Sequence, residues 1–375
     1  MAFEEFASLL SGICAHTSFV ANRPILWTII ANPQAGGFTI KSRWKKHHAQ
    51  LTECVQRAIK NPLNEKAAPS QTAVREAGPT ADAGLIPTLK EGHAREITAA
   101  LINEAMVTVK KRGVKPFYLI ITAGGDGTSL EVLTELYHAP PEVLQNFVVL
   151  RLPMGTANDG ADARDLDKAL NLLIEPAEIS RQRAVRLRTA SGKGPFLAFN
   201  ILSVGLDAFV THMTNKMKGK LPGDSYKLWV DIAVLFYDMI YKVDFIDVRA
   251  LDKNREEVKA FREKLILIAV GESGHRCYGS SNWILPDERN MCAVKQMSLF
   301  RKIGLKELLA TGTHIGEPET MLWSAMSVEF TPQHPILAQM DGETVLLTEN
   351  DFPAVIELTE PVIPILKAEH FSKLG

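Results

Sequence analysis

Residues 122–129, Thr-Ala-Gly-Gly-Asp-Gly-Thr-Ser, constrain the fold of this chain more than any other stretch. An apolar run at 117–121 precedes them and is typical of a buried strand. Residues 129–137 follow, with leucines at every third position that favour one face of a helix. Three glycines within four residues permit a tight turn and leave no side chains to block a ligand. The sequence therefore predicts a strand, a glycine-rich turn and a helix in succession.

The glycine-rich turn has the chemistry of a phosphate site. Backbone amides at a helix N-terminus, with the helix dipole behind them, bind anions. Asp126 would repel a bare phosphate, so its position suits a phosphate that carries Mg²⁺. A glycine-rich turn without any ligand is the alternative at this point.

Two other predicted strands end in similar turns. Residues 25–31 run into Asn-Pro-Gln-Ala-Gly at 32–36, and residues 147–152 run into Pro-Met-Gly-Thr-Ala-Asn-Asp-Gly at 153–160. Predicted helices follow at 41–59, 94–112 and 166–174. Strands that alternate with helices favour an open parallel sheet covered on both faces. The loops after such strands converge at one edge of the sheet and form a cleft for a ligand.

From about residue 181 short strand-like runs replace the alternation, which predicts a mostly antiparallel β-sandwich domain. The predicted strands cover 183–187, 196–202, 245–251, 265–270, 292–299 and 325–330, and one predicted helix covers 226–241. Asp341-Gly342 reads as the turn of a hairpin across 338–345, for which a solvated Glu343 is the simplest interpretation. The apolar segment 361–366 is expected to pack back onto the first domain.

These patterns predict four parts. An N-terminal extension at 1–21 contains a short amphipathic helix, and a nucleotide-binding α/β domain covers 22–182. Within it, 66–84 lacks apolar periodicity and is interpreted as a mobile insertion, followed by an edge strand at 85–89. A β-rich domain covers 183–346, which the resemblance described below implies is the lipid-acceptor domain, and a C-terminal segment at 347–375 returns to the first domain.

Composition excludes several classes of function. The chain has 375 residues, and 42 Lys and Arg against 43 Asp and Glu leave a formal charge of −1, which does not favour nucleic acid as a partner. Its four cysteines have no metal-site spacing and fit a reducing compartment. The N-terminus lacks a basic signal region, and no apolar run is long enough to span a membrane. We expect a soluble, cytoplasmic protein.

Four motifs, in this order, resemble the diacylglycerol kinase catalytic family, which includes sphingosine, ceramide and bacterial lipid kinases. They are Asn-Pro-Gln-Ala-Gly at 32–36, Gly-Gly-Asp-Gly-Thr at 124–128, Pro-Met-Gly-Thr-Ala-Asn-Asp at 153–159 and Asp-Gly-Glu at 341–343. Phe-Asn at 199–200 and Val-Gly-Leu-Asp-Ala at 204–208 are similar to the family's motif at the start of its second domain. The resemblance covers residues 25–366. NAD kinases and phosphofructokinases have variants of the second motif, so the resemblance depends on all four motifs occurring in this order.

The resemblance implies an ATP- and Mg²⁺-dependent kinase that transfers the γ-phosphate of ATP to a hydroxyl of a lipid such as diacylglycerol. Asp126 would be catalytic and place the metal, and Glu343 would be the general base that takes the proton from the lipid hydroxyl. The implied nucleotide-binding residues are Asn32, Pro33, Gln34, Ala35, Gly36, Thr88, Gly124, Gly125, Asp126, Gly127, Thr128, Thr156 and Asn158.

The chain departs from the family pattern at two charged positions. Asp162 stands where the family's third motif ends in arginine, and Arg289 falls where many bacterial members have an acid that holds a structural Mg²⁺. We therefore predict no Mg²⁺ at 284–292 and an ion pair of Arg289 with Asp287 or another nearby acid.

The implied partners are ATP and a lipid acceptor at the membrane surface, where the enzyme would be peripheral, and a homodimer is one open oligomeric state. Two rival functions stay open. One is an NAD kinase-like enzyme, although the motif at 155–159 has no counterpart in that family. The other is a nucleotide-binding regulatory protein without turnover, which the two departures favour and the presence of Asp126 and Glu343 disfavours.

Overall fold

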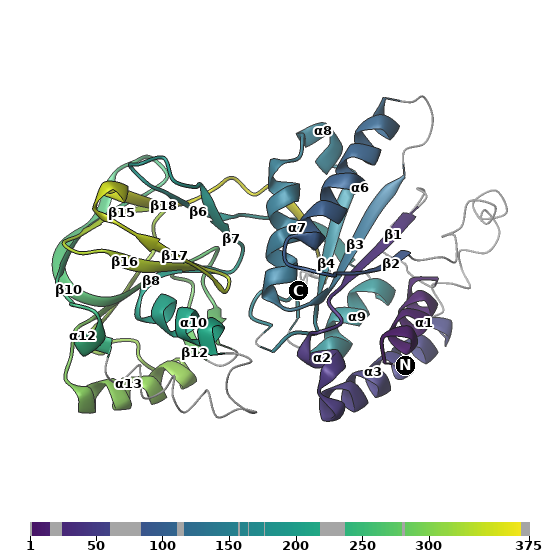
Figure 1. The fold of residues 1–375 in the computed structure, drawn as a ribbon, viewed down its shortest axis with the longest axis horizontal. Coiled ribbons are helices and arrows are strands. Elements are labelled where there is room, and N and C mark those ends of the chain that lie inside the picture. Colours follow the sequence, from purple (N-terminus) through teal and green to yellow (C-terminus); the bar gives the residue numbers. More distant parts are fainter. Residues whose placement is uncertain are drawn as a thin grey trace, which may run out of the picture. The chain divides into compact units, whose positions relative to one another are not determined.

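The computed structural model describes residues 2–15, 25–60, 84–110, 116–156, 158–163, 165–175, 177–217, 237–279 and 282–368. They form two compact units (Figure 1). The first unit runs to Gln182 and resumes at Val362, and the second is Arg183–Pro361. Apart from Gly84, the predicted mobile insertion at 66–84 lies outside the described residues.

The first unit is built on a six-stranded sheet in the order β2-β1-β3-β4-β19-β5. Strands β1 to β4 are parallel, and β19 lies parallel to β4 and antiparallel to β5. This confirms the predicted parallel sheet and the return of the C-terminal segment to it. The strands are β1 (Ile25–Ala31), β2 (Gly84–Pro87), β3 (Phe117–Gly124), β4 (Phe147–Pro153), β5 (Ala177–Gln182) and β19 (Ile363–Ala368).

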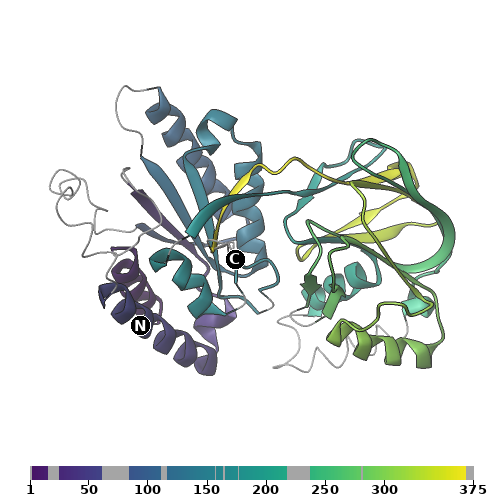
Figure 2. The same ribbon diagram turned by 180° about the vertical axis from the view of Figure 1, so that it is seen from behind.

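Helices cover both faces of this sheet, which explains why β3 and β4 are buried along their whole length. Helices α1, α3 and α9 lie on one face and α6, α7 and α8 on the other (Figures 1 and 2). The predicted N-terminal helix is confirmed as α1, which buries Phe6, Leu10 and Ile13 in the core. The helices are α1 (Ala2–Cys14), α2 (Gly36–Thr39), α3 (Lys41–Lys60), α6 (His93–Val109), α7 (Asp126–His138), α8 (Pro141–Leu144) and α9 (Leu166–Ile174).

The second unit is an eleven-stranded antiparallel sheet that curls over its own core, as the predicted antiparallel β domain requires. Strand β10 turns the sheet: its first half pairs with β9, and its second half lies between β8 and β13. The strands of this sheet are β6 (Val185–Arg188), β7 (Phe196–Ala198), β8 (Ile201–Gly205), β9 (Phe245–Leu251), β10 (Glu257–Gly271), β13 (Met291–Lys295), β14 (Thr320–Trp323), β15 (Ser327–Pro332), β16 (Ile336–Met340), β17 (Glu343–Leu347) and β18 (Ala354–Leu358).

Smaller elements complete the second unit. Strands β11 (Arg276–Tyr278) and β12 (Asn282–Leu285) form a separate pair, and η1 (Glu349–Asp351) is a single 3₁₀ turn. Helices α10 (Leu206–Met217), α12 (Tyr237–Ile240) and α13 (Leu299–Thr311) pack on the sheet around a second apolar cluster. Because β18 belongs to this sheet, the second unit continues past the expected boundary at residue 346.

Two local predictions for the second unit were wrong, and two of its helices were missed. The single strand at 196–202 is two strands, because the backbone N–H groups of Phe199 and Asn200 bond to a side chain and not to a neighbouring strand. The strand at 292–299 ends at Lys295, and α13 begins at Leu299 because Lys302 and Leu305 bury at helical spacing. Helices α10 and α13 were not predicted, and the predicted helix at 226–241 is described only from Tyr237.

Candidate active site

The three predicted loops of the first unit meet at one edge of its sheet. Strands β1, β3 and β4 are parallel and in register, with Ala31 beside Ala123 and Gly124 beside Pro153. They therefore end together, and the loops at 32–36, 124–128 and 153–160 leave the sheet side by side. Thr88 follows β2 at the same edge, and its N–H donates to Ala31 O at 2.8 Å.

The first loop is a compact turn tied to its neighbours by backbone groups. Asn32 N donates to Ala123 O at 3.0 Å, and the Asn32 side chain accepts from Gln34 N at 2.9 Å. Gly37 N donates to Met154 O at 2.8 Å, which joins this loop to the one after β4. The motif at 32–36 thus fixes the first loop against both of the others.

The second loop is the N-terminal turn of α7. Gly124 ends β3, Gly125 is the extended N-cap, and Asp126, Gly127 and Thr128 already lie in the helix. The helix begins at Asp126, three residues before the predicted start at Ser129. The N-terminus of this helix therefore lies at the sheet edge, and helix N-termini favour anions.

Asp126 joins the second loop to the third. Its Oδ1 accepts from Gly160 N at 2.9 Å. Burial raises the pKa of this carboxyl group, and the Gly160 N–H partly offsets that rise. A cation would stabilise the ionised form of such a desolvated carboxylate. Asp126 therefore fits a Mg²⁺ ion that is held by one carboxylate and by nucleotide phosphates.

The third loop depends on close backbone contact with the second. A Cβ on Gly155 would lie 2.5 Å from Gly125 Cα, so only glycine fits there. Asn158, with φ of 60°, folds its side chain back on Gly155: Oδ1 accepts from Gly155 N at 2.6 Å, and Nδ2 donates to Gly155 O at 3.2 Å. Arg43 also donates to Gly155 O at 3.2 Å, and Thr156 is exposed at the tip.

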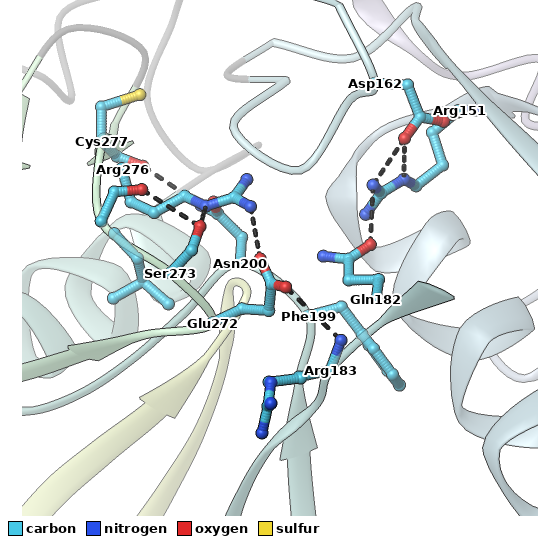
Figure 3. Close-up of polar contacts among 12 residues, drawn as sticks. Arg151, Asp162, Gln182, Arg183, Phe199, Asn200, Glu272, Ser273, Arg276 and Cys277 are labelled. Atoms are coloured by element: carbon cyan, nitrogen blue, oxygen red, sulfur yellow. Dashed lines mark hydrogen bonds and ion pairs between the residues drawn. The ribbon is translucent and has the colours of Figure 1, made fainter. Parts of the chain in front are cut away.

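A buried ion pair that the sequence reasoning did not predict anchors the end of the third loop (Figure 3). Asp162 and Arg151 are 3% and 5% exposed, and Arg151 Nη2 lies 2.6 Å from Asp162 Oδ1. Arg151 Nη2 also donates to Gln182 Oε1 at 2.9 Å. The acid at 162, singled out as a departure from the family pattern, thus has a structural partner on β4. The acid at position 162, where the family pattern has arginine, was the sequence signal that could have revealed this ion pair.

In the second unit, Asp341 and Gly342 form the predicted hairpin turn between β16 and β17. Their φ angles are 46° and 103°, as a two-residue type I′ turn requires. The Asp341 carboxylate accepts from the N–H groups of Phe199, Asn200 and Ile201, and so ties the turn to the start of β8. Glu343 follows at the first position of β17 with an exposed side chain.

The loop that carries Asn200 is itself held in place (Figure 3). Asn200 Nδ2 donates to Cys277 O at 3.1 Å, and Glu272 N donates to Asn200 O at 3.0 Å. The Glu272 side chain forms an ion pair with Arg276, whose Nε donates to Ser273 at 3.0 Å. The Phe-Asn motif at 199–200 therefore has a structural role in this unit.

The predicted ion pair at 287–289 is confirmed. Arg289 Nε lies 3.0 Å from each carboxylate oxygen of Asp287, and this pairing lowers the pKa of Asp287.

Two other kinds of feature are absent from the described residues. Over the described residues, no three His, Cys, Asp or Glu side chains gather in a way that could hold a metal ion. In the same part of the chain, no helix combines the length and apolar character needed to cross a membrane.

An apolar cavity of about 150 Å³ lies in the second unit between α10, α13 and strands β10 and β13. Its wall includes Asp207, Tyr278 and Lys302 beside mostly aliphatic side chains. Lys302 is 8% exposed, and its ammonium group pairs with Asp238 at 2.7 Å.

Comparison with known proteins agrees with these features. Two proteins called "Probable lipid kinase YegS-like" each align with 60% of this chain and 71% of their own length. The protein from Enterobacter sp. (strain 638) is 24% identical over 227 residues, and that from Yersinia enterocolitica is 27% identical over 231 residues.

The fold also has solved counterparts. A diacylglycerol kinase from Bacillus anthracis str. Sterne superposes with a TM-score of 0.54 at 14% identity, over 92% of this chain and 97% of its own. Residues 26–189, which contain the three-loop edge, match the family described as Diacylglycerol kinase catalytic domain. Over these residues, the chain is similar to the diacylglycerol kinase catalytic domain family.

Proposed function

We propose that the protein is a lipid kinase that transfers the γ-phosphate of ATP to a hydroxyl group of a lipid such as diacylglycerol. The main support for this proposal is that three family motifs lie together at one sheet edge. The N-terminus of α7, which suits an anion, lies at their centre. The match of residues 26–189 to the kinase family and the lipid-kinase names of similar proteins support it.

The loops of the first unit would hold the nucleotide. The first turn of α7, from Asp126 to Thr128, would cradle the phosphates through its backbone N–H groups. Residues 32–36, Thr88, Thr156 and Asn158 border the same edge and would contact the rest of ATP. Asp126 would hold Mg²⁺, which neutralises the charge of the transferring phosphoryl group when it is bound.

Glu343 would take the proton from the attacking lipid hydroxyl. Phosphoryl transfer depends mostly on positioning and charge neutralisation, with one base to orient the nucleophile. A general base contributes roughly 10²–10⁴-fold when it lies within hydrogen-bond reach of the proton. An exposed carboxylate at the end of a defined turn suits this role, because it is rigidly presented and still accessible.

The cavity in the second unit supports an apolar acceptor. Its wall is mostly aliphatic with a few polar side chains, and a volume of about 150 Å³ has room for part of an acyl chain. The enzyme would then work in the cytoplasm, peripheral to the membrane that supplies the acceptor.

The test is to incubate the purified protein with γ-labelled ATP and Mg²⁺, with a mixed lipid extract in one reaction and NAD in another. We expect label in the lipid phase alone. Label in NAD would instead support an NAD kinase-like enzyme. ATP binding without transfer to either acceptor would support a nucleotide-binding regulatory protein.

A further inference from the structure

The turn that presents Glu343 is held by a buried side-chain amide. Gln339, on β16, is 4% exposed, and its Oε1 accepts from Gly342 N at 3.0 Å. Its Nε2 donates to Asp207 Oδ2 at 2.9 Å. One amide thus connects the residue before Glu343 to an acid in the first turn of α10.

Asp207 fixes which way this amide points. Its carboxylate is 3% exposed and also accepts from Ser203 Oγ at 2.5 Å. Burial raises its pKa to about 6, so at neutral pH it is mostly ionised and can only accept hydrogen bonds. The Gln339 nitrogen must therefore face Asp207, which leaves the Gln339 oxygen to accept from Gly342 N.

Helix α10 holds the turn at two further points. Asn215 Nδ2 donates to Gly342 O at 3.0 Å, in the peptide group that joins Gly342 to Glu343. His212 Nδ1 and Thr344 Oγ1 lie 3.3 Å apart. The residues on both sides of Glu343 are thus bonded to side chains that α10 supplies or orients.

We propose that Gln339, oriented by Asp207 and assisted by Asn215, is a positioning residue that sets where Glu343 presents its carboxylate. The inference rests on the proposed function, in which Glu343 is the general base. The Asp-Gly sequence favours the turn itself, with positive φ at both residues, whereas the contacts from Gln339 and Asn215 fix how the turn is oriented against α10. Without Gln339 the turn can relax and shift Glu343 at its end.

The closing experiment is a double-mutant cycle in kcat with Gln339→Leu and Glu343→Gln, assayed for phosphate transfer to lipid. A displacement of about 1 Å at a reacting group costs roughly 10²-fold, so we expect Gln339→Leu to lower kcat by about that factor. KM for ATP should not change, because the nucleotide loops lie in the first unit. In the Glu343→Gln background, Gln339→Leu should have no further effect on kcat.

Asn290→Leu is the matched control. Asn290 is also a buried side-chain amide with two hydrogen bonds: it accepts from Ala325 N at 3.1 Å and donates to Ala325 O at 3.0 Å. Its loss should lower stability about as much as the loss of Gln339 while kcat stays unchanged. If Gln339→Leu does not fold, Asn215→Ala replaces it in the cycle, because Asn215 is exposed and also bonds the backbone of Gly342.

Each outcome decides the inference. Loss of kcat only in the presence of Glu343 supports it. Equal losses in both backgrounds overturn it, because they show that Gln339 serves the fold and not the base. An unchanged kcat in the single variant also overturns it. A wild-type protein without any transfer to lipid overturns the proposed function, and the inference falls with it.

Discussion

The glycine-loop edge of the first unit and the Asp341-Gly342 turn of the second are held by different means. At the edge, mainly main-chain contacts hold the loops together: Asn32 N donates to Ala123 O, and Gly155 packs directly against Gly125. At the turn, the Gln339 and Asn215 side chains hold the main chain, and Asn215 and Asp207, which orients Gln339, lie more than a hundred residues away in the sequence. Backbone-built sites tolerate few changes in side-chain size, whereas side-chain-held turns are sensitive to the loss of single polar groups.

The largest effect is expected at the edge. Asp126→Ala should abolish turnover, because Mg²⁺ placement contributes several kcal/mol in the transition state, or about 10³-fold in kcat. Asp126→Asn separates two roles, since it keeps an acceptor for Gly160 N and loses the charge. Near wild-type kcat in Asp126→Ala would remove Asp126 from the mechanism. Asp165→Asn, which changes an acid that caps α9, should leave kcat unchanged.

Gly155→Ala tests the close packing of the loops. Its Cβ would lie 2.5 Å from Gly125 Cα and 2.9 Å from Asn158 Oδ1, so the second and third loops must separate. Overpacking costs about 1–3 kcal/mol, and we expect KM for ATP to rise by roughly 10- to 100-fold. Calorimetric ATP binding checks this. Unchanged affinity would show that the contact between the loops does not shape the nucleotide site.

The Asp207→Asn variant tests the role of Asp207 through the pH dependence of the free energy of unfolding. The folded-state pKa of Asp207 is about 6, above its ordinary value of 3.8, so its contribution to stability is full below pH 3.8 and is lost as pH rises through 6. Relative to Asp207→Asn, the wild-type protein should therefore lose about 2 kcal/mol of unfolding free energy between about pH 4.5 and 7.5. Denaturant titrations across this range measure the difference. A pH-independent difference between the two proteins would mean that Asp207 does not titrate in this window.

The smallest effect is expected at Gly304, which serves as the control for Gly155. Gly304 lies within α13, its φ is not positive, and a Cβ there would meet nothing within 4 Å. Gly304→Ala should raise the free energy of unfolding by about 0.5–1 kcal/mol, since alanine favours the helix. Denaturant unfolding checks this, and a lower free energy of unfolding would contradict the open space around a Cβ at this position.

The contrast between the two regions also explains how far the sequence could be interpreted. The edge was predictable because its strands and motifs are contiguous, and the parallel register then brings the loops together. The same logic predicted the hairpin at Asp341-Gly342, whose turn chemistry is local. The hold by Gln339 and Asp207 was not predictable, because it depends on β8, β16 and α10 meeting in the folded unit.

Other failures have the same origin. Arg151 on β4 reads as an interruption of an apolar run, and only the fold shows that it neutralises Asp162. Helix α13 was mistaken in part for a strand because its apolar residues follow β13 almost without a break. Burial of Lys302 beside Asp238, which no spacing rule predicts, helps to set the face that α13 presents to the sheet.

The most direct test compares wild-type protein and Glu343→Gln in the transfer of labelled phosphate from ATP to a lipid hydroxyl. Glutamine keeps the shape and some hydrogen bonding of Glu343, so a loss of activity cannot be assigned to a collapsed turn. We expect kcat to fall by roughly 10²–10⁴-fold, with ATP affinity unchanged. Retention of most of the turnover by Glu343→Gln would contradict this, leave Glu343 as a turn residue only, and place the base elsewhere in the protein.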